Sequence, residues 1–333
     1  MINFGPDFKH KLALSSSKIK TYQHCTQKYW CSYILKLPEK NNAGALKGDI
    51  VHSILEQLGI NRRKKLVKKI SKNGTCRLIP SVWKLIETYA KKHKICVEEE
   101  LNIIDEYIVA ALELEFYGPP GTFEILIEKD FDIEVVDLTS GISFRVRGFF
   151  DRIFLRKVRG KLSAVIADFK TNKQRYNKEE SQDNIQSNVY QLVFSLLYPE
   201  YELESLKFLF LKFKTNPILE APLLDKGQLK GFQYYLTHLQ YCIDNFTEAN
   251  ISDNYGSLKW STKFLCGPAK SGWICPHQNP LDYYSIRDEK GELVSTGFTK
   301  DELIPKLKDG ETIKEERYLG CGHFYDKQGN RKN

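Results

Sequence analysis

The chain lacks several features that would place it in a special class. It has no apolar run approaching the ~20 residues of a membrane span, and Met1 to Leu14 hold no apolar segment with a small-residue cleavage site. It also lacks internal repeats, low-complexity segments and a Gly-x-x-x-x-Gly-Lys-Ser/Thr phosphate loop. We therefore expect a cytoplasmic globular protein that contacts no membrane and carries no ATP-driven motor of its own.

The length and the cysteine content set further bounds. A chain of 333 residues can form one large domain or two modest ones. In a cytoplasmic protein, eight cysteines favour free thiols or metal ligands over disulfides. The pattern predicts a helical N-terminal region (1–117), an α/β core (118–250) and a cysteine-rich C-terminal region (251–333).

Positive charge is concentrated in the N-terminal third. Residues 1–117 hold 20 Lys and Arg against 12 Asp and Glu, although the net charge of the whole chain is +8. From Arg62 to Lys94 there are 12 basic residues and one acidic residue, Glu87. Such a segment is either the solvated face of an inserted helical region or a phosphate-binding surface.

Hydrophobic periodicity predicts the order of the elements. Helices are expected at Ser15–Trp30, Leu46–Leu58 (ending at Gly59), Arg62–Lys94, Glu98–Phe116, Gln182–Leu197 and Asp225–Ala249. Strands are expected at Phe123–Val136, Ile142–Leu155, Leu162–Phe169 and Leu206–Phe213. Turns are expected around Asp137–Gly141 and Arg156–Lys161.

One Asp-x-Lys sequence stands out by its context. Asp168 and Lys170 end an apolar strand, and side chains at i and i+2 of a strand share a face. Asp151, on the preceding strand, can converge on the same space. Two carboxylates beside a fixed positive charge suit a divalent cation and attack of water on a phosphodiester. The other copies, at Asp7 and Asp288, lie in a polar stretch and a turn.

Five motifs in order carry a resemblance to a known family. They are Leu14–Cys25 (a Ser-rich helix leading to a cysteine), Gly48-x-x-x-His52-x-x-x-Glu56, Gly148-x-x-Asp151-Arg152, Asp168-x-Lys170-Thr171 and Gln186-x-x-x-Tyr190. The chain resembles the PD-(D/E)xK nuclease superfamily, in particular the branch with the RecB and AddB nuclease domains and the CRISPR-adaptation nucleases. The resemblance implies a restriction-endonuclease-like α/β core.

The resemblance also implies roles for individual residues. His52, Asp151, Asp168 and the carbonyl of Phe169 would bind Mg²⁺ or Mn²⁺, and Lys170 would orient the attacking water. Gln186 and Tyr190 would place the DNA or the catalytic groups, and Glu56 would fix His52. Without the resemblance, each is an ordinary residue: His52 a surface or core histidine, Asp151-Arg152 a structural ion pair, and Gln186 and Tyr190 a plain helix face.

By the same resemblance the chain would be a metal-dependent DNA nuclease, an exonuclease acting in recombination, repair or processing. Its partners would be single-stranded DNA or duplex ends, with a separate helicase or recombination protein supplying any motor. Two alternatives stay open. One is a non-catalytic DNA-binding or assembly module of the same fold, against which the intact Asp151, Asp168 and Lys170 argue. The other is an RNA-directed nuclease.

Four cysteines are candidates for a second metal site. In AddB-type and CRISPR-adaptation nucleases, one cysteine before the core and three after it hold a 4Fe-4S iron–sulfur cluster, which here implies Cys25, Cys266, Cys275 and Cys321. The long gap between Cys275 and Cys321 departs from that family's pattern. A structural Zn²⁺ site, formed by the Cys-x-His pairs at Cys275 and Cys321, and no metal at all are the alternatives. The remaining cysteines are expected to be buried apolar residues: Cys31, Cys76, Cys96 and Cys242.

Overall fold

The computed structural model describes residues 1–3, 7–40, 43–60, 63–172, 174–177, 180–181, 183–259, 262–267 and 274–332. Two of the expected helix starts, at Arg62 and Gln182, lie outside these ranges. The chain forms two compact units, one of Met1–Ala13 with Asn41–His238 and one of Leu14–Lys40 with Leu239–Asn333. The division into three consecutive regions at 117 and 250 stays a prediction.

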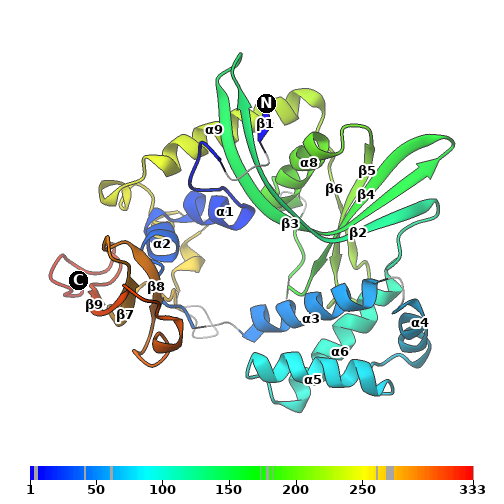
Figure 1. Cartoon of the computed structure of the whole chain (residues 1–333), viewed down its shortest axis with the longest axis horizontal. Helices are drawn as coiled ribbons and strands as arrows, with labels where there is room; N and C mark the ends of the chain where they lie inside the picture. The colour runs from blue at the N-terminus through cyan, green and yellow to red at the C-terminus, as the bar shows by residue number, and fades with distance from the viewer. Residues whose placement is uncertain are drawn as a thin grey trace. The chain divides into compact units, whose positions relative to one another are not determined.

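The first unit is built on a six-stranded mixed sheet with the order β1-β2-β3-β4-β5-β6 (Figure 1). All neighbouring strands are antiparallel except β4 and β5, which are parallel and are joined through helix α8. The strands are β1 (Ile2–Asn3), β2 (Thr122–Asp137), β3 (Ile142–Val158), β4 (Lys161–Lys170), β5 (Glu202–Phe210) and β6 (Ile218–Ala221). The turn between β3 and β4 falls at Arg159 and Gly160, both with positive φ, as their sequence predicts.

The side chains of β4 point alternately to the two faces of the sheet. Val165, Ala167 and Phe169 join the core formed with α3 and α6. Asp168 and Lys170 point to the opposite face, where their side chains contact α8. In Figure 1, α3 and α6 accordingly lie across one side of the sheet and α8 lies on the other. The strand expected at Leu162–Phe169 is confirmed, and the alternation of its side chains places Asp168 and Lys170 on the same face.

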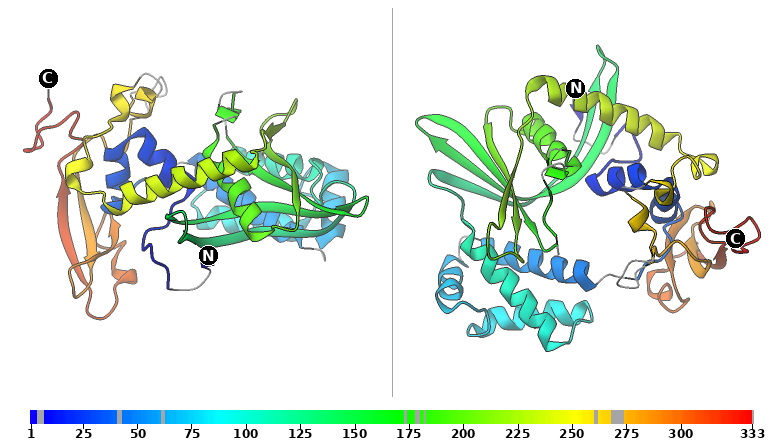
Figure 2. Two further views of the ribbon diagram at one scale, coloured as in Figure 1. Left: turned by 90° about the horizontal axis from the view of Figure 1, so that it is seen from above. Right: turned by 180° about the vertical axis from the view of Figure 1, so that it is seen from behind.

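A layer of four helices lies on the first side of the sheet, in which α4 and α5 pack against α3 and α6, and the view from behind in Figure 2 shows α5 and α6, in cyan, next to α3. They are α3 (Ala43–Gly59), α4 (Lys64–Asn73), α5 (Pro80–Lys92) and α6 (Glu98–Glu113). Proline at the first position of α5 and Gly74 in the left-handed conformation after α4 are ordinary helix signals. Among the residues that the structure describes, the first unit also contains α8 (Ile185–Leu197) and most of α9 (Lys226–Asp244).

The second unit combines an N-terminal segment with the C-terminal third of the chain. Its helical elements are α1 (Ser16–His24), α2 (Thr26–Tyr29), the π-helix Trp30–Ile34 and the 3₁₀ turns Glu248–Asn250, Gly256–Leu258, Lys263–Leu265 and Ile304–Lys306. A three-stranded antiparallel sheet has the order β8-β7-β9, with β7 (Leu281–Arg287), β8 (Leu293–Gly297) and β9 (Thr312–Tyr318). This small sheet lies within the long gap between Cys275 and Cys321.

The expected restriction-endonuclease-like α/β core is confirmed, with two differences in its elements. The N-terminal helix does not run unbroken from Ser15 to Trp30, because Cys25 adopts an extended conformation (φ −163°) and ends α1. Ser15 caps α1 as its type predicts. The segment after Phe210 leaves the β5 strand, so the strand expected to reach Phe213 ends earlier. Within the described residues, no helix has both the length and the apolar character needed to cross a membrane.

Candidate active site

The ends of β4 and α8 form a hydrogen-bonded network around Asp168. The carboxylate oxygen Oδ1 of Asp168 accepts hydrogen bonds from Gln186 Nε2 (2.8 Å) and Tyr190 OH (3.0 Å). Lys170 Nζ donates to Gln186 Oε1 at 2.8 Å and lies 2.6 Å from the second oxygen, Oδ2, of Asp168. The sequence interpretation of Gln186 and Tyr190 as neighbours of the catalytic groups therefore has a geometric basis.

On the other side of β4, His52 of α3 faces Asp151 and the backbone of Phe169. His52 Nε2 is 3.2 Å from the Phe169 carbonyl oxygen, and His52 Nδ1 is 3.5 Å from Asp151 Oδ2. Asp151 Oδ2 also accepts a hydrogen bond from Phe169 N at 2.7 Å. Three of the four residues expected to surround a metal are thus brought together, and the fourth, Asp168, precedes Phe169 on the same strand.

Glu128 of β2 completes this arrangement, and sequence reasoning missed it. Its carboxylate is 3.6 Å from His52 Nδ1. Within the described residues, His52, Glu128 and Asp151 form the group of metal-binding types whose donor atoms all lie within 4.8 Å of one another. The signal that could have found Glu128 is its position after the apolar run Ile125–Ile127, on the strand paired with β3.

The backbone at Glu128 is unusual. Its φ is +45°, a left-handed value that non-glycine residues rarely adopt within a strand. The strand pairing joins Ile127 to Arg152 and Lys129 to Phe150, which leaves Glu128 across from Asp151. Strained residues of this kind are concentrated at functional sites, where the surrounding structure holds them in place.

Burial and charge together shift the acid–base behaviour of the site. Burial, and then the nearby Asp168 carboxylate, raise the pKa of Asp151. Burial alone would lower the pKa of His52, but Asp151, Glu128 and Asp168 outweigh it and raise this pKa to about 9. The pKa of Lys170 is likewise raised, because the attraction of Asp168 exceeds the cost of burying an ammonium group.

Arg152 attaches α3 to the sheet and does not pair with its neighbour's side chain. Its Nη2 donates to the Leu55 carbonyl in the last turn of α3 at 2.8 Å, and Nη1 donates to the Asp151 carbonyl at 3.2 Å. Burial lowers the pKa of Arg152 to about 10. The structural ion pair considered for Asp151-Arg152 is therefore wrong. Glu56, expected to fix His52, is exposed, and the ring nitrogens of His52 face the groups described above.

The donor set fits a hard divalent cation. Asp168 Oδ2 is buried, and the ammonium group of Lys170 lies 2.6 Å from it and balances its charge. Carboxylate and carbonyl oxygens with one imidazole are ligands that Mg²⁺ and Mn²⁺ accept. His52, Glu128, Asp151, the Phe169 carbonyl and Asp168 Oδ2 are therefore the groups that could hold such an ion.

In the second unit, the four cysteines singled out by the sequence line one small cavity, together with Gln27, Lys28, His277, Gln278 and Phe324. Gly256 lies next to two of them, since a Cβ atom there would be 3.4 Å from Cys25 Cβ and 3.8 Å from Cys266 Sγ. Burial raises the pKa of Cys266, Cys275 and Cys321, and neighbouring cysteines raise each of them further. Four cysteines around one small cavity suit a metal that displaces the thiol protons.

Among the described residues, no three of these thiols lie as close together as the ligands of a single zinc ion do. Zinc–sulfur bonds of about 2.3 Å bring tetrahedral ligands within about 4 Å of one another. The cysteines are not among the described groups with all donor atoms within 4.8 Å. His277 Nε2 is also engaged, by Glu39 Oε1 (2.8 Å) and Ser32 Oγ (3.0 Å).

Of the four cysteines expected in the core, Cys31 and Cys76 are buried. Cys96 is exposed, because it lies in the connection between α5 and α6, and Cys242 is half-buried on α9. The expectation of burial was wrong for these last two.

Comparison with known proteins decides the family. The profile of the PD-(D/E)XK nuclease superfamily matches residues 13–266, which include the whole network around Asp168 and the group around His52. The chain belongs to the PD-(D/E)XK nuclease superfamily. The matched range includes Cys25 and Cys266 but ends before Cys275 and Cys321.

The chain is also similar to curated proteins of this kind. Two of them are named as a subunit of an ATP-dependent helicase/deoxyribonuclease, from Clostridium perfringens strains SM101 and ATCC 13124. Each is 24% identical over 204 residues, which cover 54% of this chain and 17% of the relative. The alignment thus spans about a sixth of those proteins, in agreement with the expected RecB/AddB-like branch.

Proposed function

We propose that this protein is a metal-dependent deoxyribonuclease that hydrolyses phosphodiester bonds. The observation that carries the proposal is the convergence of Asp168 and Lys170 with His52, Glu128 and Asp151 at the end of one strand. Membership of the nuclease superfamily and the deoxyribonuclease relatives support DNA as the substrate. The set of Asp151, Asp168 and Lys170 is intact, which argues against a non-catalytic module.

Each residue has a distinct task in this proposal. His52, Glu128, Asp151, Asp168 and the Phe169 carbonyl would hold one or two Mg²⁺ or Mn²⁺ ions. A bound divalent cation would polarise the scissile phosphate and offset its developing charge. Gln186 and Tyr190 fix Asp168 through Oδ1, so its metal ligand would be Oδ2, which Lys170 contacts in the structure. Helix α3, fastened by Arg152, carries His52 to the strand ends.

Lys170 acts in this scheme as a charged donor. Its raised pKa keeps the ammonium protonated at neutral pH. A protonated amine can donate a hydrogen bond to the attacking water and stabilise negative charge on the phosphate, but it cannot remove a proton. Gln186 Oε1 holds the amine in place at 2.8 Å, so the donor is positioned before the substrate arrives.

We further propose an exonucleolytic role in recombination, repair or DNA processing, with a separate helicase or recombination protein as partner. The support is the name of the relatives, which pairs helicase with deoxyribonuclease, and the absence of a phosphate-loop motif from this sequence. In the second unit we propose a 4Fe-4S cluster on Cys25, Cys266, Cys275 and Cys321, supported by their shared cavity.

The test is cleavage of end-labelled single-stranded DNA, duplex DNA and RNA in Mg²⁺ and in Mn²⁺, with the Asp168→Asn variant in parallel. Asp168→Asn removes the charge but keeps the shape, so cleavage should fall by at least about 100- to 1000-fold. The matched control is Asp130→Asn, an exposed carboxylate of β2 that should leave the rate unchanged. Full activity in Asp168→Asn would refute this site, and cleavage of RNA alone would refute the DNA assignment.

A further inference from the structure

An aromatic ring of β5 contacts the lysine of the candidate active site. Lys170 Nζ lies over the ring of Phe208, 5.5 Å from its centre. Phe208 pairs with Asp168 across the parallel ladder, and Phe210 pairs with Lys170 in the same way. Paired residues of neighbouring strands point to the same face of a sheet, so both phenylalanines lie on the face that carries Asp168 and Lys170.

Tyr176 packs against both of these phenylalanines. Its ring meets that of Phe208 at 89°, with 5.2 Å between the ring centres, and that of Phe210 at 84°, with 5.3 Å between the centres. Edge-to-face pairs of this kind are favourable beyond the area that they bury. Burial opposes the charge of Lys170, but Asp168 and then Tyr176 lie close enough to raise its pKa. Tyr176 therefore belongs to the immediate surroundings of the lysine.

Tyr176 comes from the segment that connects β4 to α8. Within residues 174–177 it is half-buried, whereas the other three residues are exposed. Its neighbour Arg175 fastens the segment to the connection between β5 and β6. Arg175 Nη1 donates to the Asn216 carbonyl at 2.6 Å, and its guanidinium group lies over the Phe213 ring, 5.1 Å from the centre. The backbone of the segment is thus held while one ring is directed inward.

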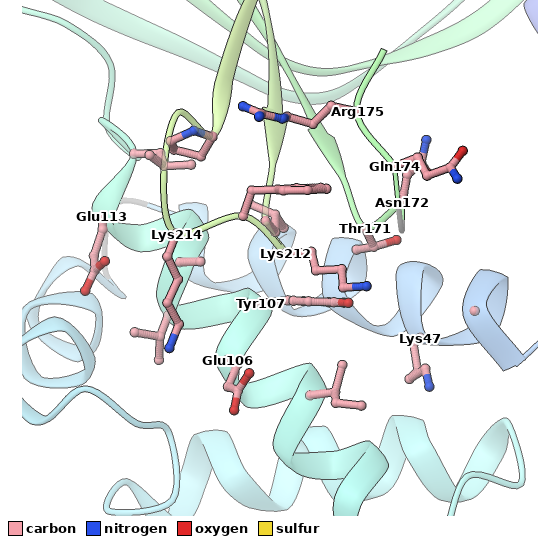
Figure 3. A pocket seen from close by; sticks show the side chains of 18 of the residues that line it. Lys47, Glu106, Tyr107, Glu113, Thr171, Asn172, Gln174, Arg175, Lys212 and Lys214 are labelled. Carbon is pink, nitrogen blue, oxygen red and sulfur yellow. The ribbon is translucent and has the colours of Figure 1, made fainter. Parts of the chain in front are cut away.

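The segment also borders a cavity of about 1540 Å³ in the first unit. Tyr176 lines this cavity together with Thr171, Arg175 and Lys212, which are labelled in Figure 3. Tyr176 is therefore in contact both with the cavity and with the two phenylalanines beside the lysine. Without its ring, water from the cavity would gain access to this aromatic surface.

Lys170 depends on such packing because its side chain is a flexible four-carbon stem. Its ammonium group is held by Gln186 Oε1 at 2.8 Å and lies 2.6 Å from Asp168 Oδ2. Asp168 Oδ2 is also a proposed metal ligand, so its contact with the lysine is one that a cation would share. The contact with the Phe208 ring is independent of that second role.

We propose that Tyr176 is a positioning residue for Lys170. Its ring holds Phe208 and Phe210 in place and keeps water of the cavity away from them. The Phe208 ring in turn supports the ammonium group at the end of β4, where it can reach a phosphate. The inference rests on the proposed nuclease function, to which it adds a residue that lies outside all five sequence motifs.

The first test is the steady-state kinetics of DNA cleavage in Mg²⁺. Tyr176→Leu keeps an apolar side chain but removes the ring, so kcat should fall about 10- to 100-fold, since a small displacement of a catalytic group is costly. KM should not change. Tyr176→Phe keeps the ring and should stay close to the unaltered protein. The matched control is Tyr198→Leu, a half-buried tyrosine stacked on Phe194 with 5.2 Å between the ring centres, which should change neither constant.

A double-mutant cycle separates positioning from a merely structural role. Residues that act through one another have effects that do not add. In a Lys170→Gln background, measured in single turnovers with excess protein, Tyr176→Leu should therefore cause no further loss. The same loss in both backgrounds, a change in KM alone, or a loss in Tyr176→Phe as large as that in Tyr176→Leu would overturn the inference. Thermal melting of each variant verifies that the fold is retained.

The second test needs neither DNA nor metal. A short pulse of acetic anhydride, followed by peptide mass spectrometry, measures how accessible the amine of Lys170 is. The side chain of Lys170 is 14% exposed, so it should react slowly in the unaltered protein and severalfold faster in Tyr176→Leu. The exposed Lys214 should react equally in both.

The two readouts distinguish this inference from the proposed function. Faster labelling of Lys170 in Tyr176→Leu, in a protein that cleaves no substrate, would uphold the positioning and overturn the nuclease. Unchanged labelling together with full cleavage by Tyr176→Leu would overturn the positioning and uphold the nuclease.

Discussion

At the residue scale, a missing Cβ atom is what lets α3 approach the sheet. A Cβ atom on Gly59 would lie 2.6 Å from Ile127 Cδ1 and 2.8 Å from Arg152 Nη2, both far inside normal contact. Nearer the start of the helix, a Cβ atom on Gly48 would lie 3.0 Å from Thr171 Oγ1, beside the candidate active site. The sequence predicted only that the helix ends at Gly59. The φ of Gly59 is not left-handed, so the structure requires glycine here for space and not for a cap conformation.

Gly59→Ala should therefore destabilise the protein by about 1–3 kcal/mol, because the new methyl group must displace Arg152 or Ile127. The matched control is Gly231→Ala in α9, where a Cβ atom would meet nothing within 4 Å. There the smaller entropy cost should raise the free energy of unfolding by about 0.5–1 kcal/mol. Urea unfolding of both variants measures the difference, and equal midpoints would show that α3 adapts freely.

Side-chain alternation explains why part of the site was predictable from sequence. Asp168 and Lys170 lie on one face of β4 because strands alternate, and Gln186 and Tyr190 lie one helical turn apart. Glu128 could not be assigned this way, because its participation depends on a positive φ that no pattern in the sequence indicates. The exposed position of Glu56 likewise depends on how α3 is rotated on the sheet.

At the scale of elements, α4 gives the basic segment a definite surface. Val67 and Ile70 are buried, whereas the five lysines of the helix are exposed: Lys64, Lys65, Lys68, Lys69 and Lys72. The helix holds no acidic residue. The sequence predicted a basic helical face, and it left open whether that face is merely solvated or binds phosphate. Binding measurements can separate the two.

The variant Lys65→Gln/Lys68→Gln/Lys72→Gln should weaken DNA binding about equally for all sequences if the face binds phosphate. Fewer counterions are then released on binding, so the slope of log affinity against log salt becomes less steep by about 2 to 3. The rate of cleavage at saturating DNA should not change, since no residue of α4 belongs to the candidate active site. Lys290→Gln/Lys300→Gln/Lys308→Gln, at exposed positions of the second unit, changes the net charge equally. An identical salt slope in both triple variants would indicate a solvated face only.

At the scale of the whole molecule, the two folding units do not follow the order of the chain. The second unit joins residues 14–40 to residues 239–333. Thr26 connects the two segments directly, because its hydroxyl donates hydrogen bonds to the carbonyls of Ile251 (2.8 Å) and Asn254 (3.1 Å). Local periodicity cannot reveal a pairing across more than 200 residues, so the sequence indicated it only through the resemblance that groups Cys25 with the tail cysteines.

The proposed cluster would fasten these two distant segments to each other. Anaerobically purified protein should show the broad visible absorption of iron–sulfur proteins and hold four irons per chain. Cys25→Ser and Cys321→Ser each remove one thiolate from a different segment, so each should abolish the absorption and lower the melting temperature. Cys96→Ser, an exposed thiol of the first unit, is the control and should change neither. Bound zinc in place of iron, or full stability of both variants without metal, would show that the cavity holds no cluster and that packing alone joins the two segments.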